Sequence, residues 1–172
     1  YTMMAMMLME QGKLNYDDAV QKHLASFPYP NITIRHLMNQ TSGLPEYFDI
    51  AQGDMTLLDT LNNQSMLALL AAKKPALVFQ PGERWEYCNT NYTTLASVIE
   101  KVAATTADKF FQQHIAGPLK LTNTYVYHLN MKSYPPSRVF GLQFEGGKPV
   151  LNDLLRFDGI VGDGNVYSSA ED

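Results

Sequence analysis

Several residue types and patterns are scarce or missing in the 172-residue chain, and each absence excludes a class of protein. A single cysteine, Cys88, excludes an internal disulfide framework. The four histidines are scattered without the spacing of metal-ligand motifs, so we predict no metal site and no cofactor. The net charge is -4, and no basic run with interleaved aromatic residues occurs, which argues against a nucleic-acid partner.

The apolar runs are also too short to cross a membrane, which takes ~20 apolar residues. The Met-rich stretch over residues 3–9 lacks the charged leader and the small-residue cleavage site of a signal peptide. Because this stretch is apolar on every side, we predict a buried core helix that ends before Gly12. Its methionines are more typical of an adaptable core than of a partner-binding groove.

Both ends of the sequence resemble the interior of a longer protein. A helix that is already fully apolar at its first residue is expected to begin earlier in the chain. At the other end, Ser168 and Glu171 have the spacing of a capping box, which predicts the start of a helix. We therefore expect residues 1–172 to be one partial domain, an interior fragment of a larger protein.

The hydrophobic patterns predict a helical body followed by short strands. With 45% hydrophobic residues, the chain can bury one ordinary core. We predict residues 1–120 to be mainly helical, and residues 121–172 to hold short strands, loops and the start of a truncated helix. The predicted helices are a short stretch within 14–24, one capped by Thr33 with Ile34, Leu37 and Met38 on one face, residues 57–72 with a break at Asn62–Asn63, one with Leu95, Val98, Ile99 and Val102 on its core face, and one from Thr106 that Gly117–Pro118 stops. Residues 46–54 are predicted as loop, residues 124–127 and 139–144 as strands, and residues 145–148 as a turn.

The stretch that looks most like a functional site is residues 81–92, PGERWEYCNTNY. Pro81–Gly82 predicts a turn, and Thr90–Asn91 predicts the cap of the following helix. Tyr87 and Asn89 are two residues apart, so in an extended backbone their side chains leave on the same side. A phenol and a carboxamide are thus presented together at a helix start.

These residues resemble the Tyr-x-Asn motif of the serine β-lactamase and penicillin-binding protein superfamily, in its class C-like branch of β-lactamase-related serine hydrolases. Residues 32–37 (ITIRHL), 41–45 (TSGLP), 159–164 and 167–172 extend the resemblance, in the family's order. The fold class that it implies is predominantly α with short β strands (α+β). Such a chain is the helical region of a β-lactamase/transpeptidase-like fold, with most of the central antiparallel sheet missing.

The resemblance implies roles for two residues. Tyr87 matches the family's catalytic tyrosine, whose phenol lies beside a lysine ammonium and moves protons while a serine is acylated. Asn89 matches the asparagine that binds the amide of the substrate. The family's other two motifs, Ser-x-x-Lys and Lys-Thr-Gly, do not occur in residues 1–172. We expect the serine about four residues before Tyr1 and the third motif well beyond Asp172, so the segment alone should be inactive.

The parent protein is therefore expected to be a serine hydrolase that forms an acyl-serine intermediate with β-lactam, D-Ala-D-Ala-type peptide or ester substrates. Its expected partners are a small-molecule or peptidoglycan-type substrate and, through the apolar N-terminal helix, a second copy. The expected location is a bacterial periplasm or cell envelope, or the medium. The alternative is a non-catalytic ligand-binding or sensor domain of the same fold, and a third interpretation is a helical subdomain without chemistry of its own.

Four further features have both a catalytic and a structural interpretation, and for each we favour the structural one. Cys88 is more typical of a buried, inert thiol than of a nucleophile. Ser42 lacks the flanking glycines of a nucleophile elbow and is interpreted as a turn residue. His36 is interpreted as a partly buried histidine that holds the adjacent loop, and Gly162–Gly164 as a tight loop rather than a phosphate site.

Overall fold

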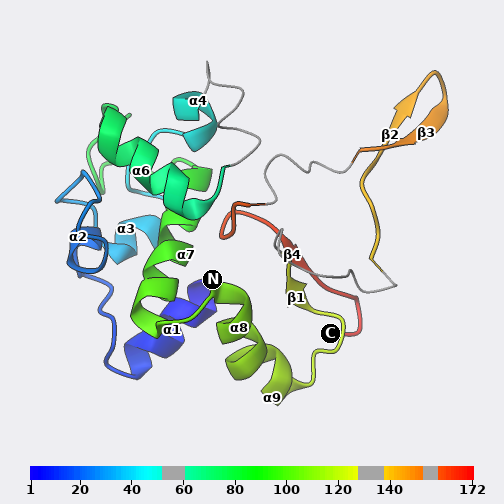
Figure 1. Cartoon of the computed structure of the whole chain (residues 1–172). Helices are drawn as coiled ribbons and strands as arrows, with labels where there is room; N and C mark the ends of the chain where they lie inside the picture. The colour runs from blue at the N-terminus through cyan, green and yellow to red at the C-terminus, as the bar shows by residue number, and fades with distance from the viewer. Residues whose placement is uncertain (52–60, 128–137, 153–158) are drawn as a thin grey trace.

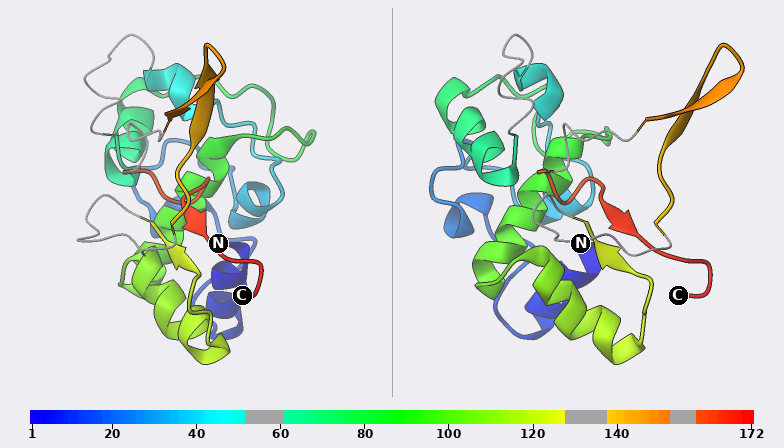
Figure 2. Two further views of the ribbon diagram at one scale, coloured as in Figure 1. Left: turned by 90° about the vertical axis from the view of Figure 1, so that its right-hand side faces the viewer. Right: turned by 45° about the vertical axis from the view of Figure 1, so that its right-hand side comes forward.

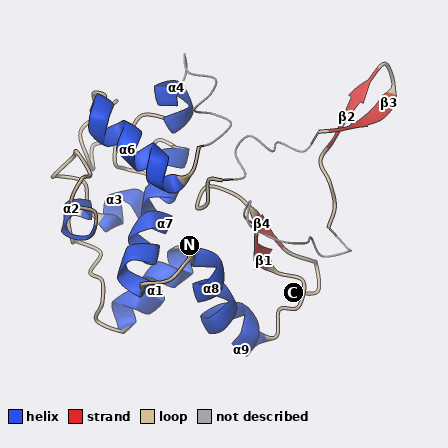
Figure 3. Ribbon diagram, viewed as in Figure 1, coloured by secondary structure: helices blue, strands red, loops and turns tan. Residues whose placement is uncertain are grey.

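The computed structural model describes residues 1–51, 61–127, 138–152 and 159–172. Helices occupy the first two thirds of the chain and short strands follow, as predicted (Figures 1 and 3). The helices are α1 (Thr2–Glu10), α2 (Val20–His23), α3 (Ile34–Met38), α4 (Tyr47–Ala51), α6 (Asn63–Lys73), α7 (Asn89–Ala103), α8 (Ala107–Phe111), the π-helical turn η1 (Gln112–Ala116) and α9 (Gly117–Leu119). The strands are β1 (Tyr125–Val126), β2 (Leu142–Glu145), β3 (Lys148–Leu151) and β4 (Val166–Tyr167). None of the helices in these described ranges has the length and apolar character of a membrane span.

Helix α7 is the centre of the fold, with α1, α2, α3, α6 and α8 packed around it (Figure 1). Leu95, Val98 and Ile99 are fully buried, which confirms the predicted core face, and Val102 packs half-buried at its end. The predicted cap at Thr90–Asn91 is wrong. The helix begins two residues earlier than a Thr90 cap would allow, and both side chains are buried within its first turn.

Helix α1 is buried on one side only, which corrects the prediction of a helix buried all round. Met4, Ala5 and Leu8 belong to the core, whereas Met3 is 58% and Met6 42% exposed. The helix ends before Gly12, as predicted, and Gly12 has the left-handed φ of +69° that favours glycine.

The predicted cap at Thr33 is confirmed, and a second cap lies at a predicted helix break. The Thr33 hydroxyl accepts the His36 amide while His36 Nδ1 accepts the Thr33 amide, and Ile34 and Leu37 are buried on the predicted face. The predicted break at Asn62–Asn63 is the start of α6, where Asn62 and Ser65 cap each other's amides. Residues 57–60 of that predicted helix lie outside the described residues.

Two predictions of local structure were wrong. Residues 46–54 were expected to be loop, but Tyr47–Ala51 forms α4, because Tyr47, Ile50 and Ala51 bury one face of a single turn and a half. Residues 52–54 lie outside the described residues. Gly117–Pro118 does not stop the helix from Thr106. The chain passes through the wide turn η1 into α9, where Pro118 sits in the first turn and needs no amide hydrogen bond.

Two small antiparallel sheets stand in place of an extended one among the described residues. β1 pairs with β4 through Tyr125 opposite Tyr167, and β2 pairs with β3 across a turn in which Gly146 and Gly147 both have positive φ. The β2–β3 hairpin projects away from the helical body (Figure 1 and the right-hand view of Figure 2). The described residues 168–172 contain no helical turn. The Ser168 hydroxyl, predicted to cap one, is 2.8 Å from Thr124 Oγ1 instead.

Candidate active site

A loop of residues 40–46, here called the supporting loop, runs beside the segment that leads to Tyr87 and Asn89. Three backbone bonds join the two, from Val78 N to Gly43 O (2.8 Å), from Gly82 N to Thr41 O (2.8 Å) and from Glu86 N to Gln40 O (3.0 Å). The backbones approach so closely at Gly43 that a Cβ there would lie 2.0 Å from the Phe79 carbonyl oxygen. The motif TSGLP therefore helps to hold, through backbone contacts, the segment that leads to Tyr87 and Asn89.

Buried polar side chains fasten the supporting loop to the first turn of α7. The Gln40 side-chain oxygen accepts the Cys88 amide at 3.0 Å and also the Asn91 side-chain amide. The Ser42 hydroxyl donates to Asn91 Oδ1 and accepts the Leu44 amide at 3.0 Å. Ser42 is fully buried with its hydroxyl used twice, which confirms its interpretation as a structural turn residue.

Tyr87 and Asn89 lie together at the start of α7. The Tyr87 hydroxyl donates to Asn89 Oδ1 at 3.0 Å, so the predicted common direction of the two side chains is confirmed. Tyr87 is 58% exposed, whereas Asn89 is half-buried. The Glu46 carboxylate, from the supporting loop, accepts both the backbone amide of Asn89 and its Nδ2 at 3.3 Å.

A pocket of about 510 Å³ opens beside Tyr87. Its walls come from the start of α1 (Tyr1), the supporting loop (Gln40), Tyr92 of α7 and residues 162–166. The Tyr92 hydroxyl lies 3.0 Å from Thr2 Oγ1 and donates to Met38 O at 3.2 Å, which ties the start of α1 to α7 at this point. Tyr1, which precedes α1, and Tyr87 therefore line one shared pocket.

The far wall of the pocket is a loop of residues 159–165, here called the anchor loop. At Gly162, with φ +120°, a Cβ would lie 2.2 Å from the Tyr92 carbonyl oxygen, which confirms the predicted tight loop. Asp163 accepts a hydrogen bond from the Tyr47 hydroxyl at 2.8 Å. Burial raises the pKa of the Asp163 carboxyl, and burial and the nearby Asp163 charge raise the pKa of Tyr47.

A family model described as Beta-lactamase matches residues 1–172. The chain belongs to the beta-lactamase family. A penicillin-binding protein of Bacillus subtilis (strain 168) is 34% identical over 179 residues, which cover 96% of this chain and 39% of that relative. The chain thus spans about two fifths of the length of that curated relative.

Solved structures of the beta-lactamase family have the same arrangement of elements. The penicillin-binding protein from Bacillus halodurans matches with a TM-score of 0.80 and 28% identity, over 98% of this chain and 52% of that one. A D-stereospecific amidohydrolase from Streptomyces sp. matches with a TM-score of 0.74 and 25% identity, over 98% and 54%. The predicted fold class, a helical region with most of the sheet missing, is confirmed.

Two titratable residues near the site of this beta-lactamase-family chain, Cys88 and His36, have the buried character that the structural interpretation predicted. Cys88 is buried, and burial raises the pKa of its thiol to about 11, so the thiolate needed for attack is scarce at neutral pH. His36 is half-buried, desolvation lowers its pKa, and its Nδ1 accepts the Thr33 amide at 3.2 Å. In the described part of the chain no three His, Cys, Asp or Glu residues gather in the way that a metal ion requires.

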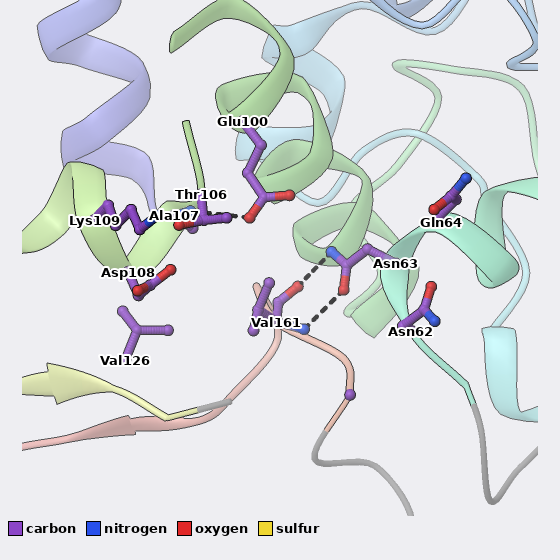
Figure 4. A pocket seen from close by; sticks show the side chains of 11 residues that line it. Asn62, Asn63, Gln64, Glu100, Thr106, Ala107, Asp108, Lys109, Val126 and Val161 are labelled. Atoms are coloured by element: carbon purple, nitrogen blue, oxygen red, sulfur yellow. Dashed lines mark hydrogen bonds between the residues drawn. The ribbon is translucent and has the colours of Figure 1, made fainter. Parts of the chain in front are cut away.

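A second pocket, of about 440 Å³, lies on the other side of the anchor loop (Figure 4). Its polar side chains join segments of the fold. Asn63 Nδ2 donates to Val161 O and its Oδ1 accepts the Val161 amide, both at 2.8 Å, while Glu100 accepts the Ala107 amide at 2.9 Å (Figure 4). Because these groups are used internally, we place the candidate site at the Tyr87 pocket.

Sequence reasoning found Tyr87 and Asn89 but missed the residues that hold them, Gln40 and Glu46. Both flank the TSGLP motif directly, and that adjacency was the available signal. Their partners lie more than 40 positions away, so no local spacing could reveal the contacts.

Proposed function

We propose that the chain contributes the Tyr-x-Asn part of a serine hydrolase, which opens β-lactam, D-Ala-D-Ala-type peptide or ester substrates through an acyl-serine intermediate and without a metal or cofactor. One observation carries the proposal: the hydrogen-bonded pair of Tyr87 and Asn89 lies beside a pocket that the start of α1 also lines. The similarity to a penicillin-binding protein of Bacillus subtilis and to the D-stereospecific amidohydrolase of Streptomyces sp. supports this substrate range.

In this proposal the serine comes from a Ser-x-x-Lys motif just ahead of α1, so that it opens into the Tyr87 pocket. As the serine oxygen attacks the substrate carbonyl carbon, its proton passes to the Tyr87 oxygen while the Tyr87 hydroxyl gives its own proton to the leaving nitrogen or oxygen. In the second step water attacks the acyl carbon and its proton passes to the Tyr87 oxygen, while the Tyr87 hydroxyl gives its own proton to the departing serine oxygen, which restores the free serine. Asn89 binds the substrate amide. Residues 1–172 alone would be inactive, since they contain neither the serine nor its lysine.

The proposal is tested by Tyr87→Phe in the full-length protein. We expect acylation by a reactive penicillin, followed by intact mass, to slow by about 10²- to 10⁴-fold, the usual contribution of a positioned acid–base group. Tyr87 is largely exposed, so the melting temperature should not change, and the exposed neighbour variant Trp85→Phe serves as the matched control. Acylation of Tyr87→Phe at the wild-type rate would contradict the role of Tyr87.

The same experiment distinguishes the second candidate, a non-catalytic ligand-binding or sensor domain. This candidate applies if either residue of the Ser-x-x-Lys motif is replaced in the full-length protein. A full-length wild-type protein that binds the penicillin reversibly and gains no mass would favour it.

The proposed location is a bacterial cell envelope or the medium, in line with the penicillin-binding proteins among the relatives. Self-association is proposed through α1, where Met3 and Met6 are exposed.

A further inference from the structure

The start of α7 draws its cap from another segment. The residue before the helix, Cys88, makes no side-chain capping bond within the described residues, unlike Thr33 before α3 and Asn62 before α6. Glu46 replaces that bond from the supporting loop, since one of its carboxylate oxygens accepts the first helical amide, that of Asn89. A carboxylate at a helix start is also favoured by the helix dipole.

The second oxygen of Glu46 accepts from the side chain of Asn89. Because an ionised carboxylate only accepts hydrogen bonds, Asn89 must turn its Nδ2 toward Glu46 and its Oδ1 toward Tyr87. The Tyr87 hydroxyl then donates to Oδ1, and one N–H of Nδ2 is left for an acceptor such as a substrate carbonyl. The charge of Glu46 thus determines which end of the Asn89 amide faces each neighbour.

We propose that Glu46 is a positioning residue, which fixes the orientation of the Asn89 amide and through it the direction of the Tyr87 hydrogen bond. The inference rests on the proposed function, because it assigns Glu46 to the same acylation reaction. Glu46 acts on substrate only through Asn89, and its effect depends on its being an acceptor at both oxygens.

Glu46→Gln separates this role from plain helix capping. A glutamine has the same shape, and its oxygen still accepts the Asn89 backbone amide. Its NH₂ group, however, is a donor, so the Asn89 amide must turn its oxygen toward residue 46 and its Nδ2 toward Tyr87. The variant therefore keeps the cap of α7 but exchanges the positions of Oδ1 and Nδ2 in the Asn89 side chain. Glu46→Ala removes both bonds and shows the cost of losing the cap.

The experiment uses the full-length protein and a reactive penicillin, and it separates the maximal acylation rate from the half-saturating concentration. We expect Glu46→Gln to lower the maximal rate about 10- to 100-fold, as a displaced reacting group does, with the wild-type melting temperature. In an Asn89→Ala background the same change should have no further effect, because Glu46 would have lost the group it orients. Glu86→Gln is the matched control. Glu86 lies three positions before Asn89 in the sequence, and its carboxylate is exposed and paired with Arg84, so this variant should acylate at the wild-type rate.

The other possible outcomes contradict either the inference about Glu46 alone or the inference together with the proposed function. Wild-type acylation of Glu46→Gln, with Asn89→Ala slow, overturns the Glu46 inference and leaves the proposed function intact. An equal loss of rate in both backgrounds also overturns it, because Glu46 then acts elsewhere. A melting temperature of Glu46→Gln as low as that of Glu46→Ala reduces Glu46 to a cap. Normal acylation of Asn89→Ala, or no adduct with the wild type, overturns the proposed function and this inference together.

Discussion

The supporting loop and the anchor loop both pack against the first half of α7, and both make many polar contacts. Their hydrogen-bond networks differ in whether they reach the protein surface. On the anchor side, the Asn63 side chain is buried and bonds to Thr93 O, Val161 O and the Val161 amide, so its partners are all internal. On the supporting side, the chain of bonds from Glu46 through Asn89 ends at the exposed Tyr87 hydroxyl. We infer that the hydrogen bonds of Asn63 to internal backbone groups stabilise the fold, whereas the network that ends at the exposed Tyr87 hydroxyl can also contact a substrate.

The largest effect that would sharpen this comparison is expected at Asn63. Asn63→Ala leaves the amide and the carbonyl of Val161 without their side-chain partner, whereas Thr93 O keeps the Ser97 hydroxyl, so we expect a loss of about 2 kcal/mol in the free energy of unfolding. The exposed neighbouring variant Gln64→Ala should stay within about 0.5 kcal/mol of wild type. Urea unfolding of the full-length variants measures both, and an Asn63→Ala protein of wild-type stability would break the comparison.

A smaller, pH-dependent effect is expected at Asp163, where the anchor loop reaches the pocket. Burial raises the pKa of this carboxyl above its ordinary 3.8, so the folded protein binds the proton more tightly than the unfolded chain. Its contribution to stability is therefore present below about pH 3.8 and is lost as the pH rises through the folded pKa.

Asp163→Asn tests this sign. The asparagine oxygen still accepts from the Tyr47 hydroxyl, and the penalty of burying a charge is gone. We expect the variant to melt slightly higher than wild type at neutral pH, with the difference shrinking toward about pH 4. A variant that is destabilised at neutral pH, with the loss shrinking toward about pH 4, would show instead that the carboxylate charge is needed in the fold.

The smallest effect is expected at Cys88, a buried residue whose backbone amide donates to Gln40 of the supporting loop. With its pKa raised from 9.0 to about 11, the thiol should have an about 100-fold smaller thiolate fraction at pH 8 than in the unfolded chain. Native protein should react with iodoacetamide correspondingly more slowly than urea-unfolded protein. Equal rates would mean that Cys88 is accessible and would reopen its interpretation as a nucleophile.

The parts of the fold that could be predicted are those whose signals are local. Thr33 caps a helix with a residue three positions away, as predicted, and the α7 core face follows from a periodic pattern. Tyr87 and Asn89 could be paired for the same reason, since two positions in an extended backbone share a side. The resemblance to a family supplied their chemical roles.

The parts that could not be predicted depend on distant partners. Glu46 was given no role in the site because its partner, Asn89, is 43 positions away, and α4 was predicted as loop because it is too short for its pattern to stand out. Pro118 was expected to stop a helix, because nothing local indicates the wide turn before it that makes the proline acceptable. Tertiary contacts decided all three.

The close backbone approaches at Gly43 and Gly162 limit how far the site can be redesigned. Each holds one of the two loops against its neighbour at a distance that leaves no room for a side chain. A library that varies substrate preference should therefore keep both glycines fixed. The varied positions should be exposed residues of the segment that leads to Tyr87, such as Trp85, because their side chains face solvent and substitutions there leave the backbone of the two loops unchanged.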